Sequence, residues 1–228
     1  MDYGGVLTTS ISASMAAFCL TTRVSPERLR EVLAEAYLAD GDGPNTPEPP
    51  CDGNADRTST RETSLGHLIA DLETGRLAPD RFESLLATAL SVGLAEPLAP
   101  AGLIHRLFST VVLDDRMLRA VGRIRRQGVK AGVLSNTWGR SVFHPEVLER
   151  FDAVVLSERE GLRKPDPRIY RVAAQRLGLQ PGDCVFVDDM AANVEGARAV
   201  GMVGVLHKHP DLTIRRLAEL LAVDLDGA

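Results

Sequence analysis

The sequence predicts an α/β protein in which a helical block interrupts a doubly wound, parallel sheet. In the second half of the 228-residue chain, short apolar runs alternate with amphipathic helical segments. This alternation is typical of a parallel sheet covered by helices on both faces. In the first half, helical periodicity recurs without such runs. With 44% hydrophobic and 25% charged residues, the composition is that of a globular protein with a core of its own.

The helices of the first half form the predicted insertion, a small helical domain over residues 14–109. Ser25 and Pro26 mark a helix start, with serine as N-cap and proline in the first helical position, and the helix is expected to end at Gly41. Residues 41–62 are rich in Gly, Pro, Asn and Asp, so we expect a long flexible loop there. Further helices are predicted at 65–74, 79–90 and around 103–107.

The α/β core is predicted to comprise residues 1–13 and 110–228. Its strands are expected at four apolar runs, at 130–135, 153–157, 183–188 and 203–206. The helices between and around them are expected at 115–127, 166–177, 191–200 and 213–221. This order predicts a Rossmann-like, doubly wound core.

Polar residues follow the predicted strands. Ser135 and Asn136 end the first apolar run, and Asp188 and Asp189 end the third. Lys164 lies in the loop after the second run. Ligands of open α/β sheets bind outside the carboxyl ends of the strands. Because carboxylates hold Mg²⁺ while Ser, Asn and Lys bind phosphoryl oxygens, this edge predicts a site for a phosphate and a divalent cation.

Four segments of the chain resemble, in the same order, the motifs of the haloacid dehalogenase-like hydrolases. These segments are Asp2–Thr8 (DYGGVLT), Val133–Asn136 (VLSN), Lys164–Pro167 (KPDP), and Val187–Asp189 with Asn193, Gly196 and Ala197. An ordered set across nearly the whole chain is far more specific than one motif. The insertion resembles the small helical cap of this superfamily. Glu73-x-Gly75 followed by Phe82 resembles the cap of the subgroup that includes the phosphatase domain of soluble epoxide hydrolases.

The resemblance implies a magnesium site. Mg²⁺ is expected to bind the Asp2 carboxylate, the Gly4 backbone carbonyl and Asp189. Asp188 is expected to act next to these ligands or through a water. Asn193, from the fourth motif, is expected to support the site from behind.

The resemblance also implies a phosphatase mechanism acting on a small phosphorylated metabolite. Asp2 is expected to be the nucleophile that attacks phosphorus and forms an aspartyl-phosphate. Lys164 is expected to offset the negative charge gathered at the site. Ser135 is expected to hydrogen-bond the phosphoryl group, and Asn136 to help bind substrate.

One departure from the family pattern concerns the acid/base. Phosphatases of this family usually carry a second Asp two residues after the nucleophile, and here that position is Gly4. A positioned acid/base typically contributes ~10²–10⁴-fold in rate. Sugar 1-phosphates or acyl phosphates, which have easier leaving groups, are therefore expected to suit this site better than simple alkyl esters.

A second departure concerns the start of the chain. The family holds its nucleophile at the end of a central apolar strand, and only Met1 precedes Asp2 here. We expect the encoding DNA to continue in frame upstream with a short strand rich in Val, Ile and Leu. Otherwise the sheet lacks its central strand, and Asp2 hangs from a mobile terminus.

Two other functions stay open at the level of sequence. A 2-haloacid dehalogenase needs the nucleophile but no metal, and Gly4 permits it, whereas the acidic pair Asp188-Asp189 argues against it. A catalytically weak or inactive phosphate- or partner-binding domain is favoured by Gly4 and the short start. A receiver domain is excluded because there the acidic pair comes first in the chain and the lysine last.

Charge and composition limit the kinds of partner and the cellular location that we expect for this protein. The net charge of −5 disfavours a protein dedicated to nucleic acid. No run approaches the ~20 apolar residues of a membrane span. Three scattered cysteines without a CxxC pattern are typical of the reducing cytoplasm, where we expect this protein.

Overall fold

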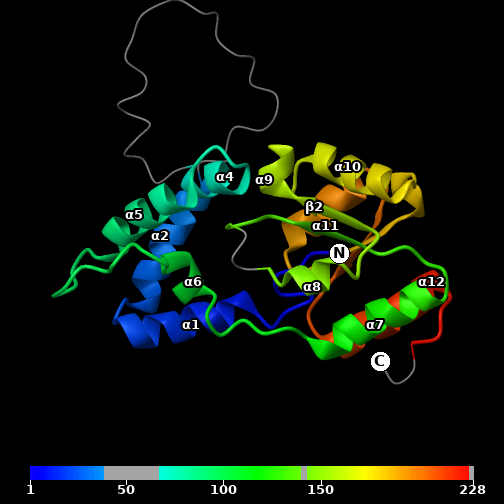
Figure 1. Ribbon diagram of the computed structural model, residues 1–228, viewed down its shortest axis with the longest axis horizontal. Helices are drawn as coiled ribbons and strands as arrows, with labels where there is room; N and C mark the ends of the chain where they lie inside the picture. Colours follow the sequence, from blue (N-terminus) through cyan, green and yellow to red (C-terminus); the bar gives the residue numbers. More distant parts are fainter. Residues whose placement is uncertain (39–66, 140–142, 226–228) are drawn as a thin grey trace, which may run out of the picture.

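The structure is a computed structural model that describes residues 1–38, 67–139 and 143–225 (Figure 1). Figure 1 shows two parts side by side, a helical part built from the first half of the chain and an α/β part built from the second. The predicted fold class is confirmed. The predicted loop at 41–62 and the predicted helix end at Gly41 lie outside the described residues.

Within the described residues, four short strands form two parallel pairs. Strand β1 (Gly132–Ser135) pairs with β2 (Ala153–Leu156), and β3 (Val185–Asp188) pairs with β4 (Val203–Leu206). Each strand falls within its predicted apolar run. The functional positions Ser135 and Asp188 are the last residues of β1 and β3, so both lie at the carboxyl edge.

The first two residues of the chain join the two pairs. The Met1 amino group donates to the Gly132 carbonyl at 2.8 Å, and the Leu134 N–H donates to the Met1 carbonyl at 2.9 Å. On the other side, the Asp2 N–H donates to the Val187 carbonyl at 2.8 Å. Asp2 is thus fixed between β1 and β3 and only 9% exposed, so it is not a mobile end.

Helices cover both faces of the strands, as the doubly wound prediction requires. Helices α7 (Asp115–Arg126) and α12 (Pro210–Leu221) lie together on one face, and α10 (Pro167–Leu177) and α11 (Ala191–Ala199) lie on the other (Figure 1). Alternate strand residues enter two separate clusters: Val133 and Val187 pack on the α7–α12 side, whereas Leu134 and Phe186 pack on the α10 side. Shorter helices are α8 (Pro145–Leu148), α9 (Ser157–Glu160) and the 3₁₀ turn η3 (Pro181–Asp183).

Side-chain caps explain where several helices begin. The Asp114 carboxylate accepts from the N–H groups of Arg116 and Met117 at the start of α7, and Asp166 accepts from the Arg168 N–H at the start of α10. Such caps satisfy backbone donors that the helix itself leaves unpaired.

The helical part has its own apolar core. Its helices are α1 (Ile11–Thr22), α2 (Pro26–Leu38), α4 (Leu68–Glu73), α5 (Pro79–Leu90) and α6 (Leu103–Leu107). Phe18, Ile69 and Phe82 lie within one buried cluster. The Arg28 N–H bonds the Ser25 hydroxyl at 3.0 Å, as the predicted N-cap requires.

Among the described helices of this part, α1 is the one that the sequence did not indicate. Its sequence, ISASMAAFCLTT, mixes small polar and apolar residues, so it shows no clear apolar stripe. It buries Phe18 and Cys19 in the helical core and exposes Leu20. Packing, more than local pattern, makes this segment helical, and it begins at Ile11, ahead of the predicted boundary at residue 14.

The described helices and cysteines bear on the predictions about membrane spans and disulfides. None of the described helices is long and apolar enough to cross a membrane. Cys19 and Cys184 are buried free thiols.

Candidate active site

A buried lysine joins two carboxylates at the carboxyl edge of the strands. The Lys164 Nζ lies 2.8 Å from Asp2 Oδ1 and 2.7 Å from Asp188 Oδ2. Lys164 is 1% exposed and Asp188 is fully buried. Three segments supply these side chains: the N-terminal residues, the end of β3, and the loop between α9 and α10. Because an unpaired buried charge is very costly, the three groups hold one another in place.

The charges of this cluster favour a cation. Although burial opposes it, the charges of Asp2 and Asp188 raise the pKa of Lys164, which therefore stays protonated. Desolvation of its carboxyl group, together with the nearby charges of Asp2 and Asp188, raises the pKa of Asp189 to about 6. One ammonium stands beside three carboxyl groups, those of Asp2, Asp188 and Asp189. A cluster of acids of this kind attracts a positive ion.

Asp188 is fixed on all sides. Its Oδ1 accepts from the Met190 N–H at 2.9 Å and from Asn193 Nδ2 at 3.0 Å, while Oδ2 holds Lys164. Asn193 belongs to α11, and its carbonyl accepts from the Tyr170 hydroxyl at 2.7 Å. The Asp188 carboxylate is therefore occupied in orienting Lys164, and Asn193 orients Asp188 from behind.

The donor set fits a hard divalent cation. One oxygen each from Asp2, Asp188 and Asp189 lies within 4.8 Å of the others. Carboxylate oxygens are the ligands that Mg²⁺ prefers. The loop after Asp2 closes on this group, since a Cβ on Gly5 would lie 2.2 Å from Asp189 Oδ2, and Gly5 has φ +74°. Only glycine fits so close to Asp189 with this backbone conformation.

Gly4 supplies no acid, and the side chain nearest to it is apolar. A Cβ on Gly4 would lie 2.8 Å from Ile11 Cδ1, at the start of α1. The space that a longer side chain would need is therefore shared with an apolar residue of the helical part.

Asn136 holds the loop that carries Lys164. Its Oδ1 accepts from the Lys164 N–H at 2.8 Å, and its Nδ2 donates to the Lys164 carbonyl at 3.1 Å and to Glu73 Oε2 at 3.2 Å. Ser135 is buried, and its hydroxyl donates to the Asn136 carbonyl at 3.3 Å. The structure thus brings both predicted residues to the cluster, with Asn136 in bonds that position the lysine.

Glu73 contacts both loops of the site, although the sequence marks it only through the Glu73-x-Gly75 pattern. It lies in α4, is 2% exposed, and accepts from Trp138 Nε1 at 3.0 Å and from Arg163 Nε at 2.7 Å. Arg163 directly precedes Lys164 in the chain, and Trp138 lies shortly after Asn136. Glu73 therefore ties the helical part to both loops of the site. The Glu73-x-Gly75 pattern was the one available signal.

Gly75 allows the helical part to approach helix α9 of the core closely. It has φ +73°, and a Cβ there would lie 2.8 Å from the Glu158 carbonyl oxygen in α9. Figure 1 shows α4 next to α9. A side chain at this position would push the helical part away from the core.

The fold and the cluster define a class of protein: an α/β core with a helical part beside it and a carboxylate–lysine cluster at the strand ends. Residues 1–201 match a family described as hydrolase, haloacid dehalogenase-like hydrolase. The chain belongs to the haloacid dehalogenase-like hydrolases.

Two relatives and one solved structure illustrate this membership. The chain is 40% identical over 156 residues to phosphatase MT3486 of Mycobacterium tuberculosis, covering 64% of this chain and 70% of that protein. It is 25% identical over 184 residues to bifunctional epoxide hydrolase 2 of Sus scrofa, covering 76% of this chain but only 32% of that protein. A predicted HAD-like family hydrolase from Porphyromonas gingivalis shares the fold, with TM-score 0.63, 21% identity and coverage of 98% and 96%.

Proposed function

We propose that this hydrolase is a Mg²⁺-dependent phosphatase that acts on a small phosphorylated metabolite through an aspartyl-phosphate on Asp2. The observation that carries the proposal is the buried Lys164, which bridges Asp2 and Asp188 beside a third carboxylate, Asp189. The relation to a mycobacterial phosphatase supports it.

The first half of the reaction uses the free oxygen of the nucleophile. Lys164 and the Tyr3 N–H both bond Asp2 Oδ1, at 2.8 Å each. These bonds orient the carboxylate, and Oδ2 attacks phosphorus. The P–O bond to the leaving oxygen breaks as the Asp2–phosphorus bond forms. Lys164 and the Ser135 hydroxyl stabilise the charge on the phosphoryl oxygens.

The second half returns the enzyme to its starting state. A water attacks the phosphorus of the aspartyl-phosphate, which releases inorganic phosphate and restores the Asp2 carboxylate. Since Gly4 cannot protonate a leaving oxygen or activate this water, substrates whose leaving group needs little protonation are favoured.

Mg²⁺ is assigned to Asp2, Asp189 and the Gly4 carbonyl, with Asp188 behind them. When bound, it would supply charge neutralisation for the phosphoryl group. Asp188 keeps Lys164 protonated and in place, so that positioning and charge supply most of the rate.

A phosphate-release screen tests the function. We expect release from a panel of sugar phosphates with Mg²⁺ and none with EDTA, and loss of at least ~10³-fold in kcat on Asp2→Asn, because the nucleophile is removed. Asp80→Asn, an exposed acid of α5, is the matched control and should retain full activity. Activity that survives Asp2→Asn contradicts the nucleophile.

The choice of substrate class has its own test. Glucose 1-phosphate should turn over faster than glucose 6-phosphate, because its anomeric oxygen is the better leaving group. Equal rates would contradict the argument from Gly4. Chloride release from a 2-haloacid without Mg²⁺ would instead identify a dehalogenase.

A further inference from the structure

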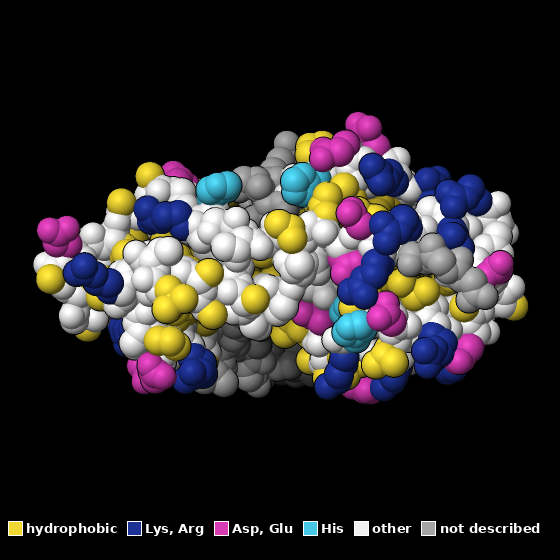
Figure 2. Space-filling view, turned by 90° about the horizontal axis from the view of Figure 1, so that it is seen from below, with side chains coloured by type: hydrophobic (Ala, Val, Ile, Leu, Met, Phe, Trp, Pro, Cys, Tyr) yellow, Lys and Arg dark blue, Asp and Glu magenta, His cyan; other side chains and the backbone are white. Residues whose placement is uncertain are grey.

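A groove lined mainly by arginines lies on helix α7, away from the active site. Its volume is about 360 Å³. Helix α7 lies at the lower edge of the α/β part in Figure 1, and the view from below in Figure 2 shows Lys and Arg side chains gathered over that part. We call this hollow the arginine groove and define it by six lining residues: Leu118, Arg119, Gly122, Arg123, Arg126 and Arg150.

Two segments of the chain and a glycine build the groove. Arg150 follows α8 and therefore comes from a segment separate from α7. Within α7, a Cβ on Gly122 would lie 3.5 Å from Arg126 Nη1, so the Arg126 guanidinium lies over the bare backbone of Gly122. A glycine in a helix interior is less stable than an alanine. The helix thus carries its weakest helix former at the place where the groove is open.

The arginines of the groove outnumber its acids. Asp115 is the single acid among the described residues that line it, against four arginines. In the described part of the chain, the guanidinium groups of Arg119, Arg126 and Arg150 form no ion pair. The negative end of the helix dipole favours arginines in the last turn of α7, but it does not account for Arg119 in mid-helix or for Arg150 outside the helix. These guanidinium groups are therefore open to an anion.

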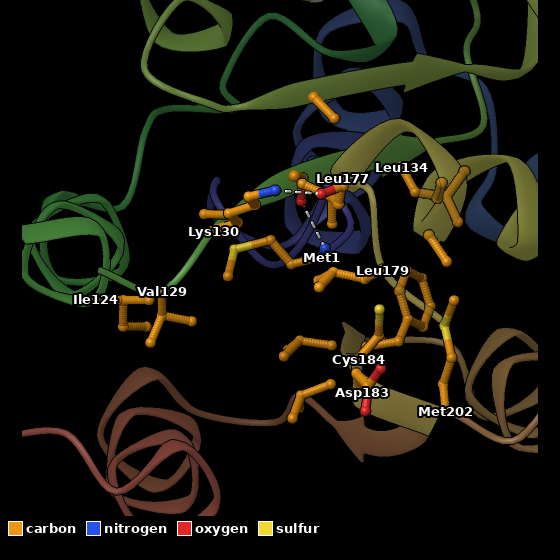
Figure 3. A pocket seen from close by; sticks show the side chains of 18 of the residues that line it. Met1, Ile124, Val129, Lys130, Leu134, Leu177, Leu179, Asp183, Cys184 and Met202 are labelled. Atoms are coloured by element: carbon orange, nitrogen blue, oxygen red, sulfur yellow. Dashed lines mark hydrogen bonds between the residues drawn. The ribbon is translucent and has the colours of Figure 1, made fainter. Parts of the chain in front are cut away.

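Two basic neighbours of the groove are engaged elsewhere. Arg125 Nη2 lies 2.6 Å from Asp152 Oδ1. The Lys130 ammonium donates to the Leu177 carbonyl at 2.7 Å, and Figure 3 shows it directed at that carbonyl. Lys130 and Asp152 precede β1 and β2, so this region lies at the amino ends of the strands, whereas the active-site cluster lies at their carboxyl ends. The groove, and not these neighbours, offers guanidinium groups to a ligand.

We propose that the arginine groove binds a compact oligophosphate, an anion of two or three linked phosphoryl groups. Guanidinium groups pair with phosphoryl oxygens through two parallel hydrogen bonds, and three such groups from two segments match several phosphoryl groups better than one. The volume lies at the lower end of the range for small-ligand sites, ~300–1,000 Å³. A nucleic acid would need positive charge repeated along a longer surface, and the net charge of the chain is −5. Inorganic oligophosphate and the phosphate chain of a nucleotide share this chemistry.

Isothermal titration calorimetry of the full protein with inorganic triphosphate tests the proposal. EDTA is present throughout, so that no divalent cation draws the anion to the active site. We expect Arg119→Ala and Arg150→Ala each to raise the Kd at least ~10-fold, because each loses charge-assisted hydrogen bonds. Arg30→Ala, at an exposed arginine of α2, is the matched control and should change the Kd less than ~2-fold. Inorganic phosphate should bind at least ~10-fold more weakly than triphosphate, since it reaches fewer guanidinium groups.

Gly122→Leu separates the shape of the groove from its charge. The leucine fills the groove, keeps every arginine and favours the helix, so the protein should stay folded by circular dichroism while the Kd rises at least ~10-fold. Tighter binding of ATP than of triphosphate indicates a nucleotide, and equal or weaker binding of ATP indicates a free oligophosphate; both support the groove when Gly122→Leu weakens them. Equal triphosphate affinity in the unsubstituted protein, Arg119→Ala and Gly122→Leu overturns the proposal. So does the absence of binding at ~1 mM triphosphate, or binding of a DNA duplex in its place.

Discussion

Lys164 is the residue on which the site most depends. It is a buried cation that two carboxylates compensate, Asp2 and Asp188. The sequence already marks it through the Lys-Pro segment at 164–165, but a lysine is by default a surface residue. Its near-complete burial is a property of the folded chain.

Replacing Lys164 should therefore destabilise the protein. Lys164→Met keeps the aliphatic stem and removes the charge, which leaves two buried carboxylates facing each other. We expect a loss of ~3–5 kcal/mol in the free energy of unfolding at pH 7, measured by urea denaturation. Lys208→Met, at an exposed lysine, should change it by no more than ~0.5 kcal/mol. Equal effects of the two variants would contradict the role of Lys164 as counter-ion.

His207 gives the protein a dependence of stability on pH. It is buried beside Thr213, whose hydroxyl lies 2.9 Å from its Nδ1. Burial, assisted by the charge of His209 and opposed by that of Asp114, lowers its pKa below 6.5. As the pH falls below 6.5, His207 takes up a proton in the unfolded chain before it does so in the folded protein. The free energy of unfolding therefore decreases as the pH falls from neutral toward the pKa of His207 in the folded protein.

Urea denaturation of His207→Asn and of the unsubstituted protein at pH 7.5 and 5.5 checks this sign. The variant should lose less stability over this interval than the unsubstituted protein. His105→Asn, at an exposed histidine, should leave the pH dependence unchanged. A steeper pH dependence of stability in His207→Asn would contradict this sign, because it would mean that protonated His207 stabilises the folded protein.

At the scale of elements, α4 is attached to the core by one buried acid. Glu73 bonds Trp138 and Arg163, and Trp138 in turn stacks edge-on against Phe82 of α5 at 5.3 Å between ring centroids. Burial raises the pKa of Glu73, opposed chiefly by Arg163. The helical part and the α/β core thus share a hydrogen-bonded and aromatic contact at Glu73 and Trp138.

Glu73→Ala should loosen this contact. Removing a buried acid that accepts hydrogen bonds from three donors costs ~2–4 kcal/mol in the free energy of unfolding. Because Trp138 is the single tryptophan, its fluorescence emission should shift to longer wavelength as water reaches the ring. Asp71→Ala, which breaks only an exposed pair with Arg76, is the control and should cost ~1 kcal/mol or less without a spectral shift. An unchanged emission spectrum in Glu73→Ala would contradict the attachment.

Positively charged side chains are unevenly distributed over the surface of the molecule. Figure 2 shows Lys and Arg side chains gathered over the α/β part, whereas the net charge of the chain is −5. The proposed cation site uses the acids at the strand ends, Asp2, Asp188 and Asp189. The proposal therefore depends on this local cluster of acids and not on the net charge of the chain.

Magnesium should stabilise the whole molecule. A ligand that binds only the folded state at 100 times its Kd adds about 2.7 kcal/mol to the free energy of unfolding. We expect thermal denaturation to show a higher Tm with saturating Mg²⁺ and its reversal by EDTA. Asp189→Asn should abolish most of the increase, whereas Asp80→Asn should preserve it. An equal increase in Asp189→Asn would place the ion elsewhere.

Local sequence pattern was enough to predict the strands, most of the helices and the order of the motifs. Apolar periodicity, the N-cap Ser25, and the acids at the end of β3 act within a few residues, so they can be read from local pattern. The helix α1 was missed because its packing, and not its pattern, makes it helical. Sequence also identified Asp2, Lys164 and Asp188, because their motifs recur in a fixed order.

Only the tertiary structure decided how distant residues meet. The contact of Glu73 with Trp138 joins positions 65 residues apart, and Asn136 reaches the Lys164 backbone across 28. The same is true of Met1 and Asp2, which bond β1 on one side and β3 on the other. Such contacts follow from which surfaces can be buried together, and a local pattern carries no information on that choice.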